Sequence, residues 1–176
     1  MADRFDGLVI AGGSSRRMGG GDKTALTVGG RSMRAIAVDA LADAAKVLLV
    51  GPDGDLVEDP PGGGPLAALA AGLAQLSAPV VAVIAADLPF VTRGAVATLV
   101  DQAPAVAVDD SGRAQYLLAA YRTDDLRAVM PADPSGRSLR SVVDLLAPTM
   151  LDLPGTPPPW WDCDTPGALD QAREWG

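Results

Sequence analysis

The segment AGGSSRRMGGGDK, from Ala11 to Lys23, has the residue types of a phosphate-binding loop. Glycines let backbone amides approach phosphate oxygens closely, and cations offset the charge of a triphosphate. From Arg16 to Arg34 the chain has five cations and one carboxylate, although its formal net charge is −8. The spacing matches neither G-x-x-x-x-G-K-[ST] nor G-x-G-x-x-G. The alternative is chance clustering on a solvated face, but the glycines favour an anion-binding loop with Lys23 at the phosphates.

Asp87 is the second candidate for chemistry, because it ends the apolar run VVAVIAAD. A carboxylate in such a place is unfavourable unless it binds something. Mg²⁺ usually takes one or two carboxylates together with substrate phosphates, so one aspartate that faces a triphosphate loop is sufficient. The alternative is that Asp87 caps the turn before Leu88 and Pro89.

Two further carboxylates lie near the C-terminus, in the stretch WWDCDTP. If this stretch is extended, Asp162 and Asp164 point to the same side, as a candidate acceptor site or as a second metal site beside Asp87. The alternative is structural, because Asp164 or Thr165 would be the N-cap of a helix that has proline in its first turn.

The composition limits the chemistry further. The chain has no histidine and a single cysteine, Cys163, which excludes histidine bases, histidine-containing zinc sites and an internal disulfide. Carboxylates, lysine, arginine, backbone amides and an oxygen-bound metal remain. The acidic charge argues against a nucleic-acid-binding surface. The start MADRFDGLVI is unlike a signal peptide, and no apolar run approaches about 20 residues, so we expect a cytoplasmic protein without a membrane segment.

Apolar runs alternate with helical patterns along the chain. Strands are expected at 6–11, 46–50, 80–85, 105–108, 117–121 and 149–153, and helices at 32–44, 65–76, 92–100, 124–130, 138–146 and after Thr165-Pro166. This order predicts an α/β fold in one domain, residues 1–176, with three layers and a Rossmann-like, mostly parallel sheet that has helices on both faces. Ligands bind outside the carboxyl ends of such strands, where Gly12 and Asp87 fall.

The ordered motifs resemble those of the molybdenum cofactor guanylyltransferase family. AGGSSRRMGGGDK resembles the family's signature, and VEDPPGGGPLAALAAGL and AADLPF resemble its second and third blocks. GRAQYLLAAYR, SGRSLRSVVDLL and WDCDTPGAL extend the resemblance over nearly the whole chain. It implies transfer of GMP from GTP to the terminal phosphate of a molybdopterin-type cofactor, with release of pyrophosphate and with Mg²⁺ as the metal.

The resemblance also implies roles for individual residues. The nucleotide would be bound by Ile10, Ala11, Gly12, Gly13, Lys23, Gly51, Asp59 and Asp87. Asp87 would hold the metal, Lys23 would contact the phosphates, and Arg16 would help to neutralise the leaving pyrophosphate. GTP and the pterin would be the substrates, and contact with molybdoenzyme maturation proteins would be transient.

The chain departs from the family pattern at three places. Gly51-Pro52 stands where an asparagine is common, Tyr116 replaces a proline, and Asp162 and Asp164 replace asparagines. By resemblance, the last two departures bear on the pterin side of the site. The alternatives are a cytidylyltransferase or another small-phosphate nucleotidyltransferase of the same fold, and a non-catalytic nucleotide-binding regulator. AGG and GGPLAAL favour guanine by resemblance, and the presence of both Lys23 and Asp87 favours an enzyme.

Overall fold

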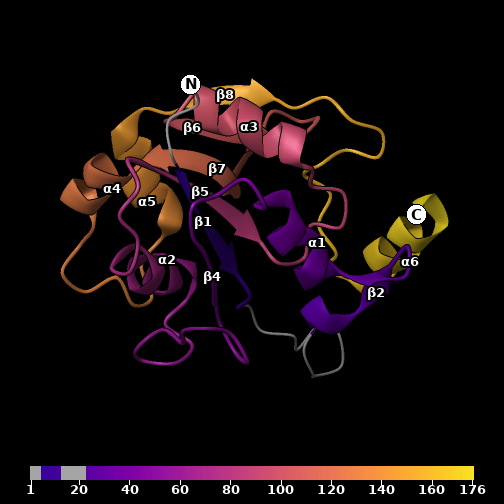
Figure 1. Ribbon diagram of the computed structural model, residues 1–176, viewed down its shortest axis with the longest axis horizontal. Coiled ribbons are helices and arrows are strands. Elements are labelled where there is room, and N and C mark those ends of the chain that lie inside the picture. Colours follow the sequence, from indigo (N-terminus) through magenta and orange to yellow (C-terminus); the bar gives the residue numbers. More distant parts are fainter. Residues whose placement is uncertain (1–4, 13–22) are drawn as a thin grey trace.

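A computed structural model describes residues 5–12 and 23–176, and six strands form its main sheet (Figure 1). The strands are β1 (Phe5–Ile10), β4 (Val47–Val50), β5 (Val80–Ala85), β6 (Ala105–Val108), β7 (Ala114–Arg122) and β8 (Thr149–Asp152). Their order is β4-β1-β5-β7-β6-β8. β1 is parallel to β4 and β5, β6 is parallel to β8, and β7 is antiparallel to both of its neighbours. The prediction of a mostly parallel sheet is confirmed.

Helices cover both faces of this sheet, as the sequence predicts. The helices of the chain are α1 (Met33–Ala40), α2 (Pro65–Leu73), α3 (Arg93–Asp101), α4 (Thr123–Val129), α5 (Leu139–Val143) and α6 (Pro166–Trp175), with short 3-10 turns η2 (Lys23–Ala25) and η3 (Asp144–Leu146). Of these, α6 packs in a separate small cluster with β2 and α1. Side chains from α1 and α3 pack on one face, and side chains from α2, α4 and α5 pack on the other. Among the described helices, none has the length and apolar character needed to cross a membrane.

A hydrophobic core lies on each face of the sheet, and the strands contribute to both because their side chains alternate between the two faces. In β1, Val9 packs toward α1 and α3, whereas Leu8 packs toward α2. In β5, Ile84 and Val83 divide in the same way. This double burial explains why the sequence shows continuous apolar runs at these strands instead of alternation.

Side-chain caps fix the starts of three helices. Ser32 accepts a hydrogen bond from the backbone N–H of Ala35 in α1, and Thr92 accepts one from Ala95 in α3. Thr165 accepts one from the N–H of Ala168 at 3.2 Å, so it is the N-cap of α6. Of the two residues that the sequence left open for this role, Thr165 fills it, and Asp164 is available for the cavity described below.

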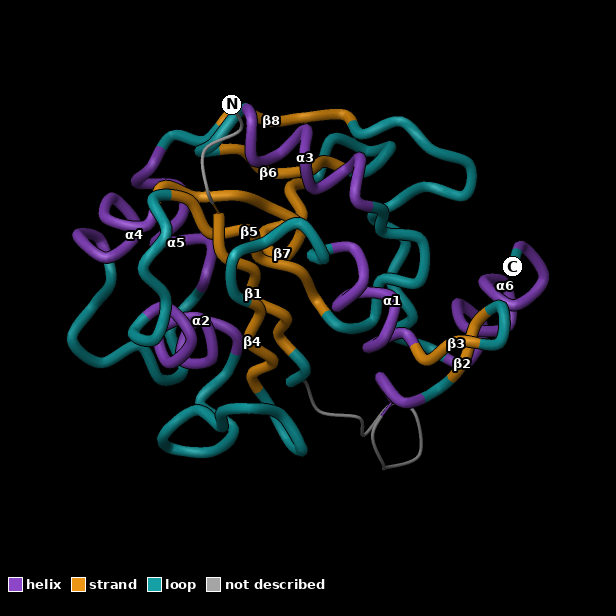
Figure 2. The backbone as a smooth tube through the Cα atoms, in the orientation of Figure 1, coloured by secondary structure: helices purple, strands orange, loops and turns teal. Residues whose placement is uncertain are grey.

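A small hairpin of β2 (Thr27–Val28) and β3 (Arg31–Ser32) was not predicted. It lies beside α6 (Figures 1 and 2), and Arg173 of that helix donates a hydrogen bond to the carbonyl oxygen of Thr27 at 3.2 Å. The hairpin connects η2 to α1, so it places Lys23 near the C-terminal segment.

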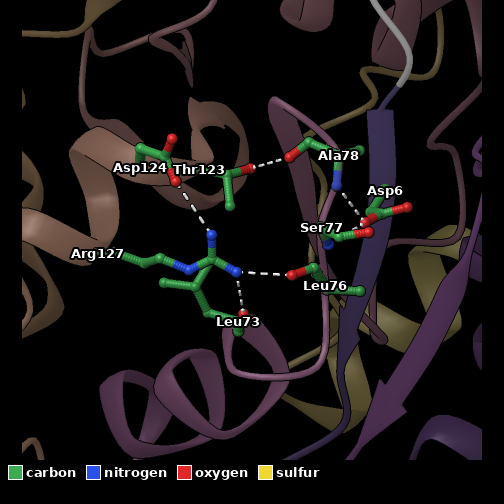
Figure 3. A network of polar contacts seen from close by, with 8 residues as sticks. All are labelled: Asp6, Leu73, Leu76, Ser77, Ala78, Thr123, Asp124 and Arg127. Carbon is green, nitrogen blue, oxygen red and sulfur yellow. Dashed lines mark hydrogen bonds and ion pairs between the residues drawn. The ribbon is translucent and has the colours of Figure 1, made fainter.

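A polar network lies at the amino ends of β1 and β5 (Figure 3). Asp6 is 3% exposed and accepts hydrogen bonds from the backbone N–H groups of Ser77 and Ala78 at 2.8 and 2.9 Å. Thr123 donates to the carbonyl oxygen of Ala78 at 2.6 Å, and Arg127 donates to carbonyl oxygens at the end of α2 and beyond it. These contacts satisfy backbone groups of the loop that precedes β5, so the network has a structural role.

Candidate active site

One cavity of about 520 Å³ opens where the carboxyl ends of β4, β1 and β5 meet the first residues of β7. Its walls include residues 10–12 after β1, 52–53 after β4, 85–88 after β5 and 115–118 in β7. Because β7 is antiparallel to β5, with Leu118 opposite Ile84, its preceding residues extend beyond the carboxyl end of β5. Loops gather at this edge of the sheet (Figure 2), which is where ligands bind in open α/β sheets.

Lys23 is a cation that lines this cavity. Its Nζ lies 2.6 Å from Oδ2 of Asp87 and 2.5 Å from Oδ1 of Asp164. The side chains of Lys23 and Asp87 are only 15% and 13% exposed, whereas that of Asp164 is 52% exposed. Burial alone would lower the pKa of Lys23, but the two carboxylates offset this and the pKa lies above its ordinary value. Lys23 is therefore charged at neutral pH.

Asp162 and Asp164 both line the same cavity. The segment is fixed beside the end of β5, because the N–H of Cys163 donates to the carbonyl oxygen of Asp87 at 3.1 Å. Burial raises the pKa of Asp162, and the nearby charges of Asp164 and Asp87 raise it further. The cavity thus concentrates carboxylates. Lys23 is the only cation among the described lining residues, and it balances their charge in part.

Cys163, between these two aspartates, is not among the described residues that line the cavity. Its side chain is fully buried, and burial together with the charges of Asp87 and Asp162 raises the pKa of its thiol to about 12. The thiol packs with the small core of β2, α1 and α6. It is a packing residue, not a nucleophile.

The donor set fits a hard divalent metal that is bound jointly with a substrate. Within the described residues, no group of three or more His, Cys, Asp or Glu side chains could hold a metal ion. Asp87 presents carboxylate oxygens in a largely buried position, and Asp162 and Asp164 line the same cavity. A carboxylate of this kind suits Mg²⁺-type ions, which retain waters and take phosphate oxygens as further ligands.

Ile10, Ala11 and Gly12, which the resemblance assigns to the nucleotide, lie together at the end of β1 and line the cavity. Gly51 does not appear among the described lining residues, although Pro52 does. Gly51 has a φ of +139°, and a Cβ there would lie 1.9 Å from the carbonyl oxygen of Ala11. A glycine is thus required for the close approach of the chain after β4 to the end of β1.

Asp59 also stays outside the described lining of the cavity. It lies in the loop before α2, next to Glu58, which is 7% exposed and accepts a hydrogen bond from the N–H of Gly62 at 3.0 Å. Pro65, at the start of α2, does line the cavity. The nucleotide-binding roles of Gly51 and Asp59 therefore stay predictions, and those of Gly13 and Arg16 fall outside the described residues.

Sequence reasoning missed most of the wall formed by β7. Gln115, Leu117 and Leu118 line the cavity together with Tyr116, whose position the resemblance had already placed on the pterin side of the site. The available signal was the polar pair Gln115-Tyr116 directly before an apolar run. Without the direction of β7, nothing placed this pair beside Asp87.

Comparisons with known proteins agree with this geometry. A profile of the MobA-like NTP transferase domain matches residues 7–149. The chain is 32% identical to a molybdenum cofactor guanylyltransferase of Rhodopseudomonas palustris (strain HaA2), over 94% of this chain and 89% of the relative.

Two solved structures show the same fold. Molybdopterin-guanine dinucleotide biosynthesis protein A from Archaeoglobus fulgidus has a TM-score of 0.66 at 20% identity and covers 96% of this chain and 97% of its own. A 2-C-methyl-D-erythritol 4-phosphate cytidylyltransferase from Thermus thermophilus has a TM-score of 0.67 at 24% identity, with coverage of 99% and 98%. The domain match and the curated relative confirm the resemblance seen in the sequence: the chain belongs to the MobA-like NTP transferase family and is a nucleotidyltransferase.

Proposed function

We propose that this protein transfers GMP from GTP to the terminal phosphate of a molybdopterin-type cofactor and releases pyrophosphate. The observation that carries the proposal is the Lys23–Asp87 pair, which lines a cavity of about 520 Å³, a size that is usual for a ligand site. The similarity to a molybdenum cofactor guanylyltransferase over 94% of the chain supports the choice of substrates.

The nucleotide occupies the half of the cavity at β1 and β4 in this proposal. Ile10, Ala11 and Gly12 contact the base and ribose, and Gly13, Gly51 and Asp59 complete the nucleotide site. Support comes from the position of residues 10–12 on the cavity wall and from Gly51, which holds the chain after β4 against Ala11.

The triphosphate lies at the centre, where charge must be balanced. Lys23 moves its ammonium from the carboxylates to the phosphates, and Arg16 stabilises the leaving pyrophosphate. Asp87 holds the metal, which we propose to be Mg²⁺. When bound, a divalent ion neutralises the charge that develops on the phosphate oxygens during transfer. The largely buried carboxylate of Asp87 and the cationic segment after β1 support this assignment.

The reaction requires alignment and charge neutralisation more than a general base. The terminal phosphate of the acceptor is already an anionic nucleophile, so no side chain has to remove a proton before attack. Oxygen of the acceptor phosphate forms a bond to the α-phosphorus of GTP, and the bond to the pyrophosphate oxygen breaks. Asp162 and Asp164 face this centre and would hold the acceptor or a second metal ion.

Three further proposals concern the whole protein. Residues 1–176 act as a single nucleotidyltransferase domain, a view that the single six-stranded sheet supports. The protein works in the cytoplasm, where its contact with molybdoenzyme maturation proteins is transient. All three can be tested independently of the chemistry.

The experiment that tests the proposal compares the melting temperature of the protein with GTP, CTP, ATP and UTP, each in the presence of Mg²⁺. A ligand that binds only the native state raises stability by an amount that grows with its concentration relative to Kd. We expect the largest shift with GTP. A larger shift with CTP would identify a cytidylyltransferase, and equal shifts would remove the basis for guanine selection. A GTP shift without pyrophosphate release when molybdopterin is added would identify a binding regulator.

A further inference from the structure

Three chain segments carry the charged groups of the candidate site. Asp87 lies just after β5, Asp162 and Asp164 lie in the segment before α6, and Lys23 begins η2, which leads into the hairpin of β2 and β3. None of these four residues belongs to a strand of the six-stranded sheet. The distances between their charges therefore depend on how the three segments pack against one another.

A small hydrophobic core joins these segments. It is distinct from the two cores on the faces of the sheet. Its buried members are Val28, Met33, Cys163, Leu169 and Ala172, and the partly buried Leu26, Phe90 and Trp161 pack against it. Stabilisation by burial grows with the apolar area that is removed from water. A core this small leaves the position of the segments strongly dependent on the contacts at its edge.

Trp175, the last residue of α6, contacts two of the three segments. Its ring meets that of Trp161 edge to face, with the ring centroids 4.7 Å apart and the planes at 70°. It also meets Phe90, at 6.0 Å and 55°. Tilted arrangements at such distances are favourable for aromatic pairs. Trp161 directly precedes Asp162, and Phe90 lies three residues after Asp87, so one side chain connects both carboxylate-bearing segments.

Arg173, in the same turn of α6, contacts the third segment. Its Nε donates to the carbonyl oxygen of Thr27 in β2 at 3.2 Å. The end of α6 lies beside the hairpin in both views of the backbone (Figures 1 and 2). Thr27 follows Lys23 by four residues, most of which form η2. The contact of Arg173 therefore holds the part of the chain that carries Lys23.

The segment before α6 holds the charged groups directly. Oδ1 of Asp164 accepts a hydrogen bond from Nζ of Lys23 at 2.5 Å, and the N–H of Cys163 donates to the carbonyl oxygen of Asp87 at 3.1 Å. Trp161 ties this segment to the helix, because its Nε1 donates to a carbonyl oxygen of α6 at 3.2 Å. The segment and α6 thus form one unit that contacts Lys23 at one end and its hairpin at the other.

We propose that Trp175 and Arg173 are positioning residues for Lys23. They hold the hairpin against the segment of Asp164 and so determine where the ammonium group lies relative to Asp87. Neither is among the described residues that line the cavity, so they act through Lys23 and not by contact with a substrate. A displacement of about 1 Å is enough to impair a charged group that must meet a ligand. This inference rests on the proposed function, in which Lys23 binds the phosphates.

The first test needs no substrate, because it measures the accessibility of Lys23 itself. The chain has two lysines, Lys23 and Lys46, so an amine-reactive reagent labels both and peptide mass spectrometry gives each rate separately. Lys23 should react slowly in the wild type, since its Nζ is ion-paired and its side chain is 15% exposed. Trp175→Ala should raise the labelling rate of Lys23 by about 3- to 10-fold through the loss of two aromatic contacts. The rate at Lys46 should not change.

The other variants make this test specific. Arg173→Ala should raise the rate at Lys23 in the same direction, and Trp175→Phe, which keeps an aromatic ring, should stay near the wild type. Glu174→Ala is the matched control, because Glu174 is exposed and its described hydrogen bond, to Gln171 at 3.3 Å, stays within α6. Melting temperatures show that each variant is folded. Unchanged labelling of Lys23 in both Trp175→Ala and Arg173→Ala, or an equal rise at Lys46, overturns the inference.

The second test measures nucleotide binding by titration calorimetry. Trp175→Ala should weaken GTP binding by about 3- to 10-fold and GMP binding less, because the displaced ammonium serves the phosphates. In a Lys23→Ala background the same substitution should have no further effect, since it acts through the group that has been removed. Equal losses of GTP affinity in both backgrounds contradict the positioning role. A wild type that binds no GTP contradicts the proposed function, and the labelling rates still decide whether α6 positions Lys23.

Discussion

Nζ of Lys23 lies 2.6 Å from Oδ2 of Asp87, although 64 residues separate them in the sequence. The cation proposed for the phosphates and the carboxylate proposed for the metal are thus paired with each other. Binding of a metal nucleotide complex would exchange this pair for two new ones, one between Lys23 and phosphate and one between Asp87 and the metal. The pairing keeps both charges satisfied in a partly buried place.

Replacing Lys23 tests its proposed contact with the phosphates. Lys23→Ala should weaken GTP binding by about 10- to 100-fold, because hydrogen bonds to charged groups contribute about 1.5–3 kcal/mol. GMP binding should weaken less. Titration calorimetry with both nucleotides measures this difference. Lys46→Ala is the control, since Lys46 contacts the carbonyl oxygen of Gln75 and does not line the described cavity. Equal losses for GTP and GMP would give Lys23 a structural role instead.

The carboxylates of the cavity should make stability depend on pH. Burial and the charges of Asp164 and Asp87 raise the pKa of Asp162, so the folded protein binds this proton more tightly than the unfolded chain does. Stability is therefore lost as pH rises from the ordinary aspartate pKa through the raised one. The asparagine of the Asp162→Asn variant cannot ionise. The free energy of unfolding of this variant should therefore exceed that of the wild type at pH 7 and equal it at a pH below the ordinary pKa of aspartate. Urea denaturation at pH 7 and pH 3 measures both values. A less stable variant at pH 7 contradicts this account.

Thr165 and Asp164 are neighbours with different roles. Thr165→Ala should lower the free energy of unfolding by about 1 kcal/mol, because the N-cap bond to Ala168 is lost, and Thr165→Ser should retain it. Asp164→Ala removes a carboxylate that is 52% exposed, so it should alter nucleotide affinity more than stability. Urea denaturation and GTP titration of the three variants test the division. The account is wrong if Asp164→Ala is the variant that unfolds more easily.

The thiol of Cys163 should be unreactive toward thiol reagents in the native protein. Its thiol is fully buried, and its pKa is raised to about 12, so almost no thiolate exists at pH 8. An aromatic disulfide reagent at pH 8 should therefore react only after urea is added. Rapid stoichiometric reaction without denaturant would show that the segment between Asp162 and Asp164 opens readily.

The sequence was most informative where burial was complete. The continuous apolar run of β5 was predicted with the observed bounds, Val80–Ala85, because turn residues flank it on both sides. The hairpin of β2 and β3 was missed, since two-residue strands are too short to show a period. Helix α1 ends at Ala40, earlier than predicted, and the chain then forms turns before β4.

The sequence predicted only part of the candidate site, and the reason is physical. Strand-end positions can be read from local patterns, which is how Gly12 and Asp87 were assigned to one edge of the sheet. The contact of Lys23 with Asp164, 141 residues away, depends on tertiary packing. The position of Gln115 likewise depends on the antiparallel direction of β7, which no local pattern specifies.

Pyrophosphate release by wild type and Asp87→Asn tests the central claim most directly. With GTP, molybdopterin and Mg²⁺, the wild type should release pyrophosphate only when both substrates are present. Asp87→Asn should fold, as judged by its melting temperature, but lose about 100- to 1,000-fold in rate, the usual effect of removing one electrostatic group from a transition state. Release without an acceptor, release with CTP in place of GTP, or a near-wild-type rate for Asp87→Asn at limiting Mg²⁺ would contradict the account.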